Sequence, residues 1–358
     1  MFSLGTGIEC KAQSQKSFKA TIEGKKTSLY TLKNKKGMKA LITNYGARLV
    51  SLYAPDRKGK MEDVVLGYDN VMDYHTKGQN FGATVGRYIG RIKGPSFELD
   101  GQTFHLQDDG LGHISHGGKP GFANRVWEVK AKNDSTLTLQ YVSPDGENGF
   151  PGELTVTLTY SLSFDNSLGV EFLATTTKPT VLNLSNHSFF NISGDLTQPI
   201  TNQQLKIAAD SIATFDKGKN LDGNFMAVVG TPFDFREART IGDSIDADND
   251  QLKITKGYDH AFKLTSKAIE PAATLYDKVS GRKMEVFTTE PAIQIYTGNG
   301  LKGNQKGKNG ILYQRRTAIC LETEHFADAP NHKNFPSTTL RPNEKFHSKT
   351  IFHFSVEK

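Results

Sequence analysis

The chain has 358 residues, of which 36% are hydrophobic and 23% charged, and it contains 34 glycines. This composition is typical of a turn-rich globular protein and excludes a disordered chain, and no apolar run is long enough to cross a bilayer. The net charge of +6 comes from scattered lysines without interleaved aromatic residues, so we expect neither a nucleic-acid partner nor a membrane partner.

The cysteines and the N-terminus limit the compartment and the domain organisation. Only Cys10 and Cys320 occur, too far apart for metal-like spacing, so a disulfide framework is excluded. Residues 1–15 lack the basic region of a signal peptide, which indicates a cytoplasmic protein. If they are the remnant of a processed signal, the protein is periplasmic or secreted. No linker divides the chain, so we expect an N-terminal extension over 1–20 and a single domain over 21–358.

Short alternating runs, separated by Gly, Asn, Asp and Pro clusters, are typical of a β-sandwich or a barrel. The pattern predicts early strands at 29–32, 39–43 and 49–53, and a helical turn at 70–75. A hairpin over 97–106 is predicted around the Asp100-Gly101 turn. The clearest alternation, at 154–162, predicts a strand, and 350–356 is the last predicted strand.

Residues 80–92 are predicted to be extended, which would place Arg87 and Arg91 on one face and the intervening glycines on the other. An arginine on a strand offers fixed donors to ligand oxygens, although a surface arginine paired with a carboxylate fits the spacing equally well. His116 precedes two glycines, in a loop that either is plain surface or carries the histidine into a cleft.

The segment 183–194 is a polar patch within a pattern of alternating apolar residues. As a strand it would direct Asn183, Ser185 and His187 to one face and Leu182 and Leu184 to the other. An imidazole among short polar side chains suits a sugar hydroxyl or a proton transfer, since histidine titrates near neutrality. The same residues also fit a structural histidine at a strand end.

Two later segments complete the pattern. After a predicted strand at 205–209, about thirty residues read as a loop, and loops of that length are usually functional. In the predicted strand 318–324, Glu322 and Glu324 share the face of Cys320. A carboxylate on such a face is costly unless it meets a partner or lines a cleft, which makes Glu322 the best carboxylate candidate.

Six segments in order resemble the aldose 1-epimerase (galactose mutarotase) family, and the resemblance extends from about Gly37 to Val356. They are Phe81–Tyr88, His116–Gly118, Asn186–Asn191, Pro232–Arg236, Tyr258–His260 and Cys320–Glu324. Each is weak alone, but the six in this order are specific. The family implies an all-β fold, a large single-domain antiparallel β-sandwich whose polar cleft holds a pyranose without a metal or a nucleotide cofactor.

The resemblance also implies roles for individual residues. His187 corresponds to the general acid at the ring oxygen, Glu322 to the general base at the anomeric hydroxyl, and His116 to a second histidine near the ring oxygen. The implied sugar-binding residues are Arg87, Asp259 and Asn80. We expect a histidine pKa near 6.5 and a glutamate pKa raised by partial burial. The expected activity is interconversion of the α and β anomers of galactose or glucose, by a monomer or homodimer whose partner is the sugar.

Three positions depart from the family pattern: Gly90 stands where Asn is frequent, Glu324 where Gln is frequent, and Ala327 where Pro is frequent. If Glu324 approaches Glu322, the pKa of one of them should rise.

Three other functions compete with this interpretation. A carbohydrate-binding sandwich without activity would need no acid and base, a glycoside hydrolase would use two carboxylates, and a phosphosugar epimerase would need a basic pocket. A histidine donor opposite a glutamate base favours anomer interconversion.

Overall fold

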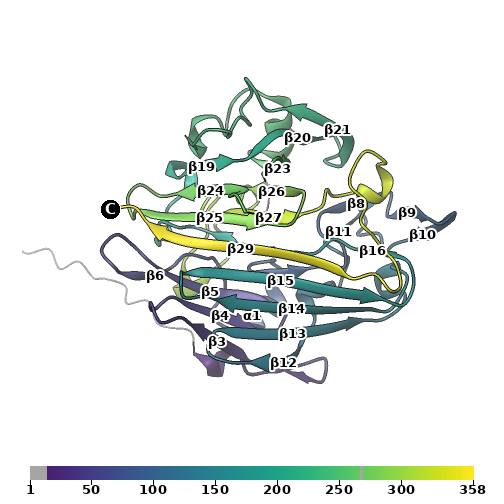
Figure 1. Cartoon of the computed structure of the whole chain (residues 1–358), viewed down its shortest axis with the longest axis horizontal. Helices are drawn as coiled ribbons and strands as arrows, with labels where there is room; N and C mark the ends of the chain where they lie inside the picture. Colours follow the sequence, from purple (N-terminus) through teal and green to yellow (C-terminus); the bar gives the residue numbers. More distant parts are fainter. Residues whose placement is uncertain (1–13, 267–268) are drawn as a thin grey trace, which may run out of the picture.

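The computed structural model describes residues 14–266 and 269–358 and confirms an all-β fold built from antiparallel sheets (Figure 1). Alternation in the sequence explains the strands. In β14 (Leu154–Leu162) the aliphatic and tyrosine side chains are buried while the intervening threonine and serine residues are partly exposed. This is the strand predicted from the clearest alternation, and it pairs with β13 and β15.

The largest sheet has nine strands, and β29 crosses its middle between β15 and β25 (Figure 1). In spatial order its strands are β12 (Glu128–Lys132), β13 (Thr136–Ser143), β14, β15 (Ser167–Thr176), β29 (Phe346–Val356), β25 (Arg282–Thr288), β24 (Ala273–Tyr276), β19 (Gln204–Ile207) and β22 (Arg239–Thr240).

A six-stranded sheet packs against the nine-stranded one. Its order is β18 (Phe189–Phe190), β27 (Ile319–Glu324), β26 (Ala292–Tyr296), β23 (Asp259–Leu264), β20 (Ala209–Phe215) and β21 (Leu221–Ala227). Leu321 and Ile293 of this sheet share one apolar cluster with Leu158 and Phe352 of the larger sheet. The main core therefore lies between the two sheets, and the other face of the six-stranded sheet is free to line a pocket.

The remaining elements are short. A four-stranded sheet consists of β3 (Leu29–Lys33), β4 (Lys39–Thr43), β5 (Arg48–Pro55) and β6 (Met61–Asp63). The two-stranded pairs are β1 (Thr21–Ile22) with β2 (Lys25–Lys26), β7 (Ala83–Val85) with β17 (Ser185–His187), β8 (Arg91–Lys93) with β11 (His113–Ser115), β9 (Ser96–Leu99) with β10 (Gln102–His105), and β16 (Thr180–Val181) with β28 (Thr339–Leu340). The helices are α1 (Val71–Lys77), α2 (Asp250–Thr255), η1 (Gln15–Phe18), η2 (Phe122–Asn124), η3 (Glu147–Gly149), η4 (Ile200–Asn202), η5 (Ile241–Asp243), η6 (Lys308–Gly310) and η7 (Ala329–Asn331).

Two predicted segments differ from the structure. Residues 80–92 are not one strand, because β7 ends at Val85 and β8 begins at Arg91, with only an isolated bridge from Tyr88 between them. The stretch after residue 209 is not a long loop, since it holds β20 and β21. Their pairing contains a register shift between Ala213 and Phe215, and such an irregularity weakens the alternation that reveals a strand.

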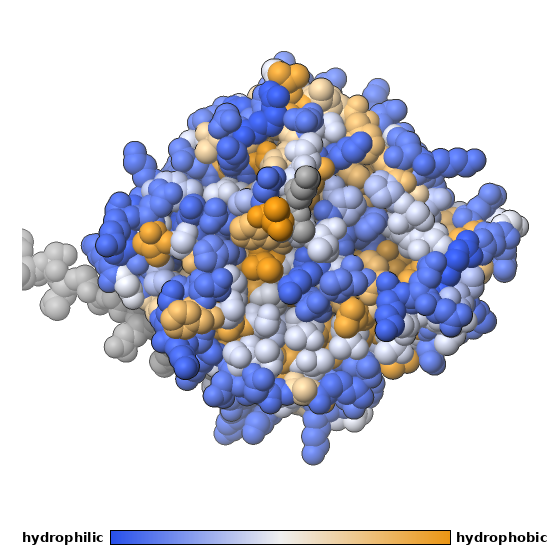
Figure 2. Space-filling model, in the orientation of Figure 1, coloured by the Kyte–Doolittle hydropathy of each residue, from blue (hydrophilic) through white to orange (hydrophobic). Residues whose placement is uncertain are grey.

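The expected N-terminal extension falls partly outside the described residues. Phe18 is fully buried in a second apolar cluster with Tyr74, so the packed structure includes η1. The boundary at residue 21 stays a prediction. Figure 2 shows hydrophilic residues over much of one face, with apolar residues in small groups. No helix in the ranges 14–266 and 269–358 is long and apolar enough to cross a membrane.

Candidate active site

A cavity of about 270 Å³ lies on the face of the six-stranded sheet that points away from the main core. Its floor comes from three adjacent strands, β23, β26 and β27. Alternation in β27 directs Glu322 and Glu324 into the cavity, whereas Leu321 points into the core. The floor residues are Asp259, Gln294, Tyr296, Glu322 and Glu324, and the strand register places Gln294 opposite Glu322 and Asp259 opposite Tyr296.

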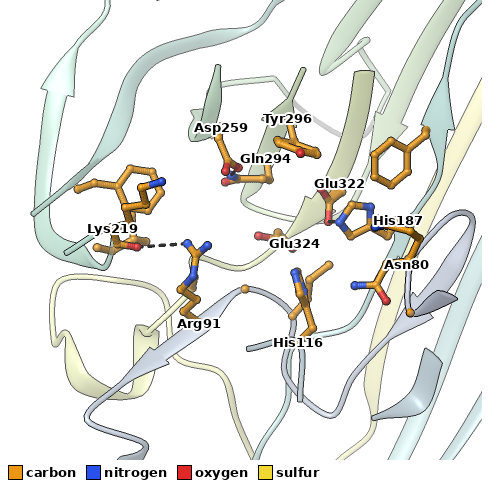
Figure 3. Close-up of a pocket in the computed structure, with 18 residues that line it drawn as sticks. Asn80, Arg91, His116, His187, Lys219, Asp259, Gln294, Tyr296, Glu322 and Glu324 are labelled. Carbon is orange, nitrogen blue, oxygen red and sulfur yellow. Dashed lines mark hydrogen bonds and ion pairs between the residues drawn. The ribbon is translucent and has the colours of Figure 1, made fainter. Parts of the chain in front are cut away.

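The opposite wall consists of side chains from short strands and loops. Asn80 precedes β7, Arg91 begins β8, His116 follows β11, and His187 ends β17. In Figure 3 these four residues face the carboxyl groups of the floor across the cavity. Residues far apart in the sequence therefore meet around one small space, of a size close to the lower end for small-molecule sites.

His187 and Glu322 form the centre of this site. Nε2 of His187 lies 3.6 Å from a carboxyl oxygen of Glu322, and the two side chains are only 8% and 4% exposed. The imidazole stacks on Phe189 with 4.9 Å between ring centroids, and its Nδ1 lies 3.5 Å from Sγ of Cys320. These contacts hold the ring so that Nε2 faces the carboxyl group.

The expected alternation of segment 183–194 is confirmed. Ser185 Oγ donates to the carbonyl of Thr323, so it bonds to the same strand that carries Glu322. Leu182 and Leu184 lie in the main core. The strand is thus anchored on both faces, which positions His187 against β27.

Both histidines of the site are shifted toward the neutral form. Burial lowers the pKa of His187 to about 3, and the neighbouring His116 acts in the same direction. Burial also lowers the pKa of His116 to about 4, with a smaller contribution from Arg91. The expected histidine pKa near 6.5 is therefore wrong for His187, because its sequence could not reveal how completely the ring is desolvated.

The carboxyl groups are shifted in the opposite direction. Burial, followed by the charge of Asp259, raises the pKa of Glu322 well above 4.5. Burial raises the pKa of Glu324 well above 4.5 as well, and Glu322, Glu290 and Asp259 add to the rise. The expectation that proximity to Glu322 would raise a carboxyl pKa is thus confirmed. Asp259 accepts a hydrogen bond from Gln294 Nε2 at 2.7 Å, and burial raises its pKa too.

The structure brings five of the six expected site residues to the cavity and places the sixth elsewhere. The five are His187, Glu322, His116, Asp259 and Asn80. Arg87 is 2% exposed and does not line the cavity, because its guanidinium donates to the carbonyls of Pro151 and Gly152 and to the hydroxyl of Ser143. The expectation that Arg87 binds the sugar is therefore corrected, and the arginine at the cavity is Arg91.

Replacing each arginine by methionine should separate the two roles. Arg91→Met is expected to raise KM about tenfold with little change in Tm, because within the described part of the chain the guanidinium makes a single hydrogen bond, at 3.2 Å to the carbonyl of Lys219. Arg87→Met should lower Tm markedly, since each buried carbonyl left without its donor costs about 1–3 kcal/mol. Polarimetry and thermal unfolding of both variants would test this, and a rise in KM confined to Arg87→Met would contradict it.

Sequence reasoning missed Gln294, Tyr296 and Lys219, among other cavity residues. Only the register of β26 against β27 reveals that Gln294 and Tyr296 share the face of Glu322. Lys219 lies in the segment that was expected to be a loop. No local signal in the sequence identifies these three residues.

Two departures from the family pattern touch each other. Gly90 has φ +78°, and a Cβ at this position would come within 2.6 Å of Cβ of Ala327. Both residues line the cavity. A side chain at position 90 would therefore require Ala327 to move.

The described part of the chain contains one group of side chains that could hold a metal ion. Ligand atoms of His187, Cys320 and Glu322 lie within 4.8 Å of one another, and all three residues are buried. An ion there would engage both His187 and Glu322. The expected absence of a metal stays a prediction.

The fold and the site define a β-sandwich protein of the galactose mutarotase type. An aldose epimerase homologue from C. elegans superimposes with a TM-score of 0.86 at 28% identity, covering 93% of this chain and 100% of that one. A galactose 1-epimerase from Lactobacillus acidophilus gives a TM-score of 0.83 at 28% identity, with 94% and 97% covered.

Sequence comparison identifies the family. The profile of the aldose 1-epimerase family matches residues 28–353. The galactose mutarotase of Homo sapiens is 37% identical over 316 residues, which is 88% of this chain and 90% of the relative, and the aldose 1-epimerase of Escherichia coli is 35% identical over 339 residues, with 94% and 97% covered. The chain belongs to the aldose 1-epimerase family and is an enzyme of the isomerase type.

Proposed function

We propose that this enzyme interconverts the α and β anomers of free aldohexoses such as galactose and glucose, with His187 as general acid and Glu322 as general base. The observation that carries the proposal is the 3.6 Å approach of His187 Nε2 to the Glu322 carboxyl group in a small polar cavity. Relatives named galactose mutarotase and aldose 1-epimerase support the reaction.

The reaction needs one proton donor and one proton acceptor. His187 gives its proton to the ring oxygen while Glu322 takes the proton of the anomeric hydroxyl, and the bond between C1 and the ring oxygen breaks. The open-chain aldehyde then rotates about its C1–C2 bond. Reclosure on the other face returns both protons, because Glu322 protonates the carbonyl oxygen and His187 removes the proton of the C5 hydroxyl.

Throughout the reaction, His187 and Glu322 together carry one titratable proton. With the cyclic sugar the pair consists of imidazolium and carboxylate, and with the open-chain sugar it consists of imidazole and carboxylic acid. Both states have zero net charge, which matters in a cavity where an unbalanced charge is costly. The lowered pKa of His187 and the raised pKa of Glu322 favour the second state in the free enzyme. The pocket thus favours the protonation state that accompanies the open chain, the species from which reclosure starts.

His116, Asn80, Asp259 and Arg91 are the groups proposed to bind the sugar. The ring of His116 lies 5.5 Å from that of His187 between centroids, on the same side of the cavity. Asp259 offers an acceptor and Arg91 offers donors, a combination that suits hydroxyl groups, which both donate and accept.

Polarimetry tests the proposed reaction directly. Optical rotation of freshly dissolved α-glucose and α-galactose should relax faster on addition of the wild-type enzyme than in buffer alone. If neither sugar relaxes faster at any enzyme concentration, the proposed function is wrong. Comparison of galactose, glucose and xylose would then show which hydroxyl groups the pocket recognises.

The dependence of rate on pH should show no step at the pKa of an ordinary histidine. Since the pKa of His187 is about 3, the pair takes up a second proton only below that pH, and it loses its single proton when Glu322 ionises at its raised pKa. We expect no loss of kcat/KM from protonation of His187 as the pH falls from about 7 to about 5, whereas a histidine with a pKa near 6.5 would become protonated over this range and lower the rate on the acid side. Initial rates by polarimetry, corrected for the spontaneous reaction in each buffer, would measure this, and a fall in kcat/KM below about pH 6.5 would contradict the lowered pKa of His187.

A further inference from the structure

Glu324 lines the cavity and is not used in the proton transfer proposed above. It lies two residues after Glu322 in β27, on the same face, and its side chain is 2% exposed. One of its carboxyl oxygens is buried without a hydrogen-bond partner among the described residues. Figure 3 shows this carboxyl group in the middle of the cavity, between Arg91 and Glu322.

Three acidic groups act on Glu324. Glu322, Glu290 and Asp259 all raise the pKa of its carboxyl group. A neutral hydroxyl group could give Glu324 a hydrogen bond only. A positively charged substituent of the ligand would give it both a hydrogen bond and a countercharge.

The order of side chains along the floor indicates which sugar carbon Glu324 faces. In Figure 3, Glu322 lies between His187 and Glu324. In a pyranose, C1 with its hydroxyl lies between the ring oxygen and C2. If His187 protonates the ring oxygen and Glu322 takes the proton of the C1 hydroxyl, Glu324 lies on the side of C2.

We propose that the enzyme also accepts 2-amino-2-deoxyaldohexoses, and that Glu324 is the specificity-determining residue that pairs with their ammonium group at C2. This inference rests on the proposed anomer interconversion, because the same cavity and the same acid and base act on both sugars. Ring opening and reclosure leave the ammonium group unchanged, so it serves only in recognition.

The test compares glucosamine hydrochloride with glucose and 2-deoxyglucose, in the wild-type enzyme and in Glu324→Gln. At about pH 6 the amine is protonated, since amines of this kind titrate near 8. We expect the wild-type enzyme to accelerate mutarotation of glucosamine. The ratio of kcat/KM for glucosamine to that for glucose should fall at least about tenfold in Glu324→Gln, because the amide keeps the shape but cannot ionise to pair with the ammonium group. The ratio of 2-deoxyglucose to glucose should change much less.

Glu290→Gln provides a matched control. Glu290 is a buried carboxyl group outside the cavity that bonds to Nδ1 of His325 at 2.7 Å and acts on Glu324 only through its charge. The glucosamine ratio should stay close to that of the wild type in this variant. An equal fall in both variants would overturn direct pairing by Glu324.

Two other results would also overturn the inference. One is acceleration of glucose but not of glucosamine by the wild-type enzyme, and the other is an unchanged ratio in Glu324→Gln. If the Glu324→Gln variant does not fold, thermal unfolding of the wild-type enzyme in the presence of each sugar replaces the kinetic comparison. Glucosamine should then raise Tm more than an equal concentration of N-acetylglucosamine, whose nitrogen is uncharged. An equal or smaller rise would count against the proposal. Absence of acceleration with both glucose and galactose would instead refute the proposed function.

Discussion

Glu322→Gln is expected to lower kcat about 10²–10⁴-fold, which is the usual contribution of a positioned general base. The amide has nearly the same shape and still accepts hydrogen bonds, but it cannot take the proton of the anomeric hydroxyl. Binding of the sugar should persist, so KM is expected to change far less than kcat. Polarimetry at saturating galactose would measure the loss, and Tm should not fall, because the variant removes a carboxyl group whose ionised form is disfavoured by burial.

The control for this prediction is Glu290→Gln, which replaces another buried glutamate outside the cavity. Its kcat should stay within about twofold of the wild type, because it does not touch the reacting atoms. A loss in Glu290→Gln as large as that in Glu322→Gln would show that buried negative charge in general, and not proton transfer by Glu322, supports the rate.

Much of the fold is predictable because strand alternation is a local signal. Strands β4 and β14 have the expected bounds, and the faces of β27 and of segment 183–194 follow from alternation alone. The interval from residue 80 to 92 is not predictable in this way. Its two short strands are separated by residues whose conformation depends on contacts with distant backbone, such as the pairing of Tyr88 with Asn183.

The site was predictable where chemistry restricts the residue type and unpredictable where geometry decides. A buried glutamate beside Cys320 and a histidine in a polar strand are unusual enough to stand out in the sequence. By residue type alone, Arg87 and Arg91 are equally suited to bind the sugar. The choice between them depends on the carbonyls of Pro151 and Gly152, which lie more than sixty residues away in the sequence and bind Arg87. The depth of burial that lowers the pKa of His187 is likewise a property of the whole fold.

His187→Gln is expected to lower kcat by about 10²–10⁴-fold as well, because the amide cannot deliver a proton to the ring oxygen. The decisive measurement is the double variant with Glu322→Gln. When two groups act as one unit, removing the second costs little more, so the double variant should be about as active as either single variant. His325→Gln, which changes a histidine outside the cavity, should keep nearly full activity. Losses that multiply in the double variant would mean that His187 and Glu322 act independently, which would contradict a shared proton passing between the sugar and two groups 3.6 Å apart.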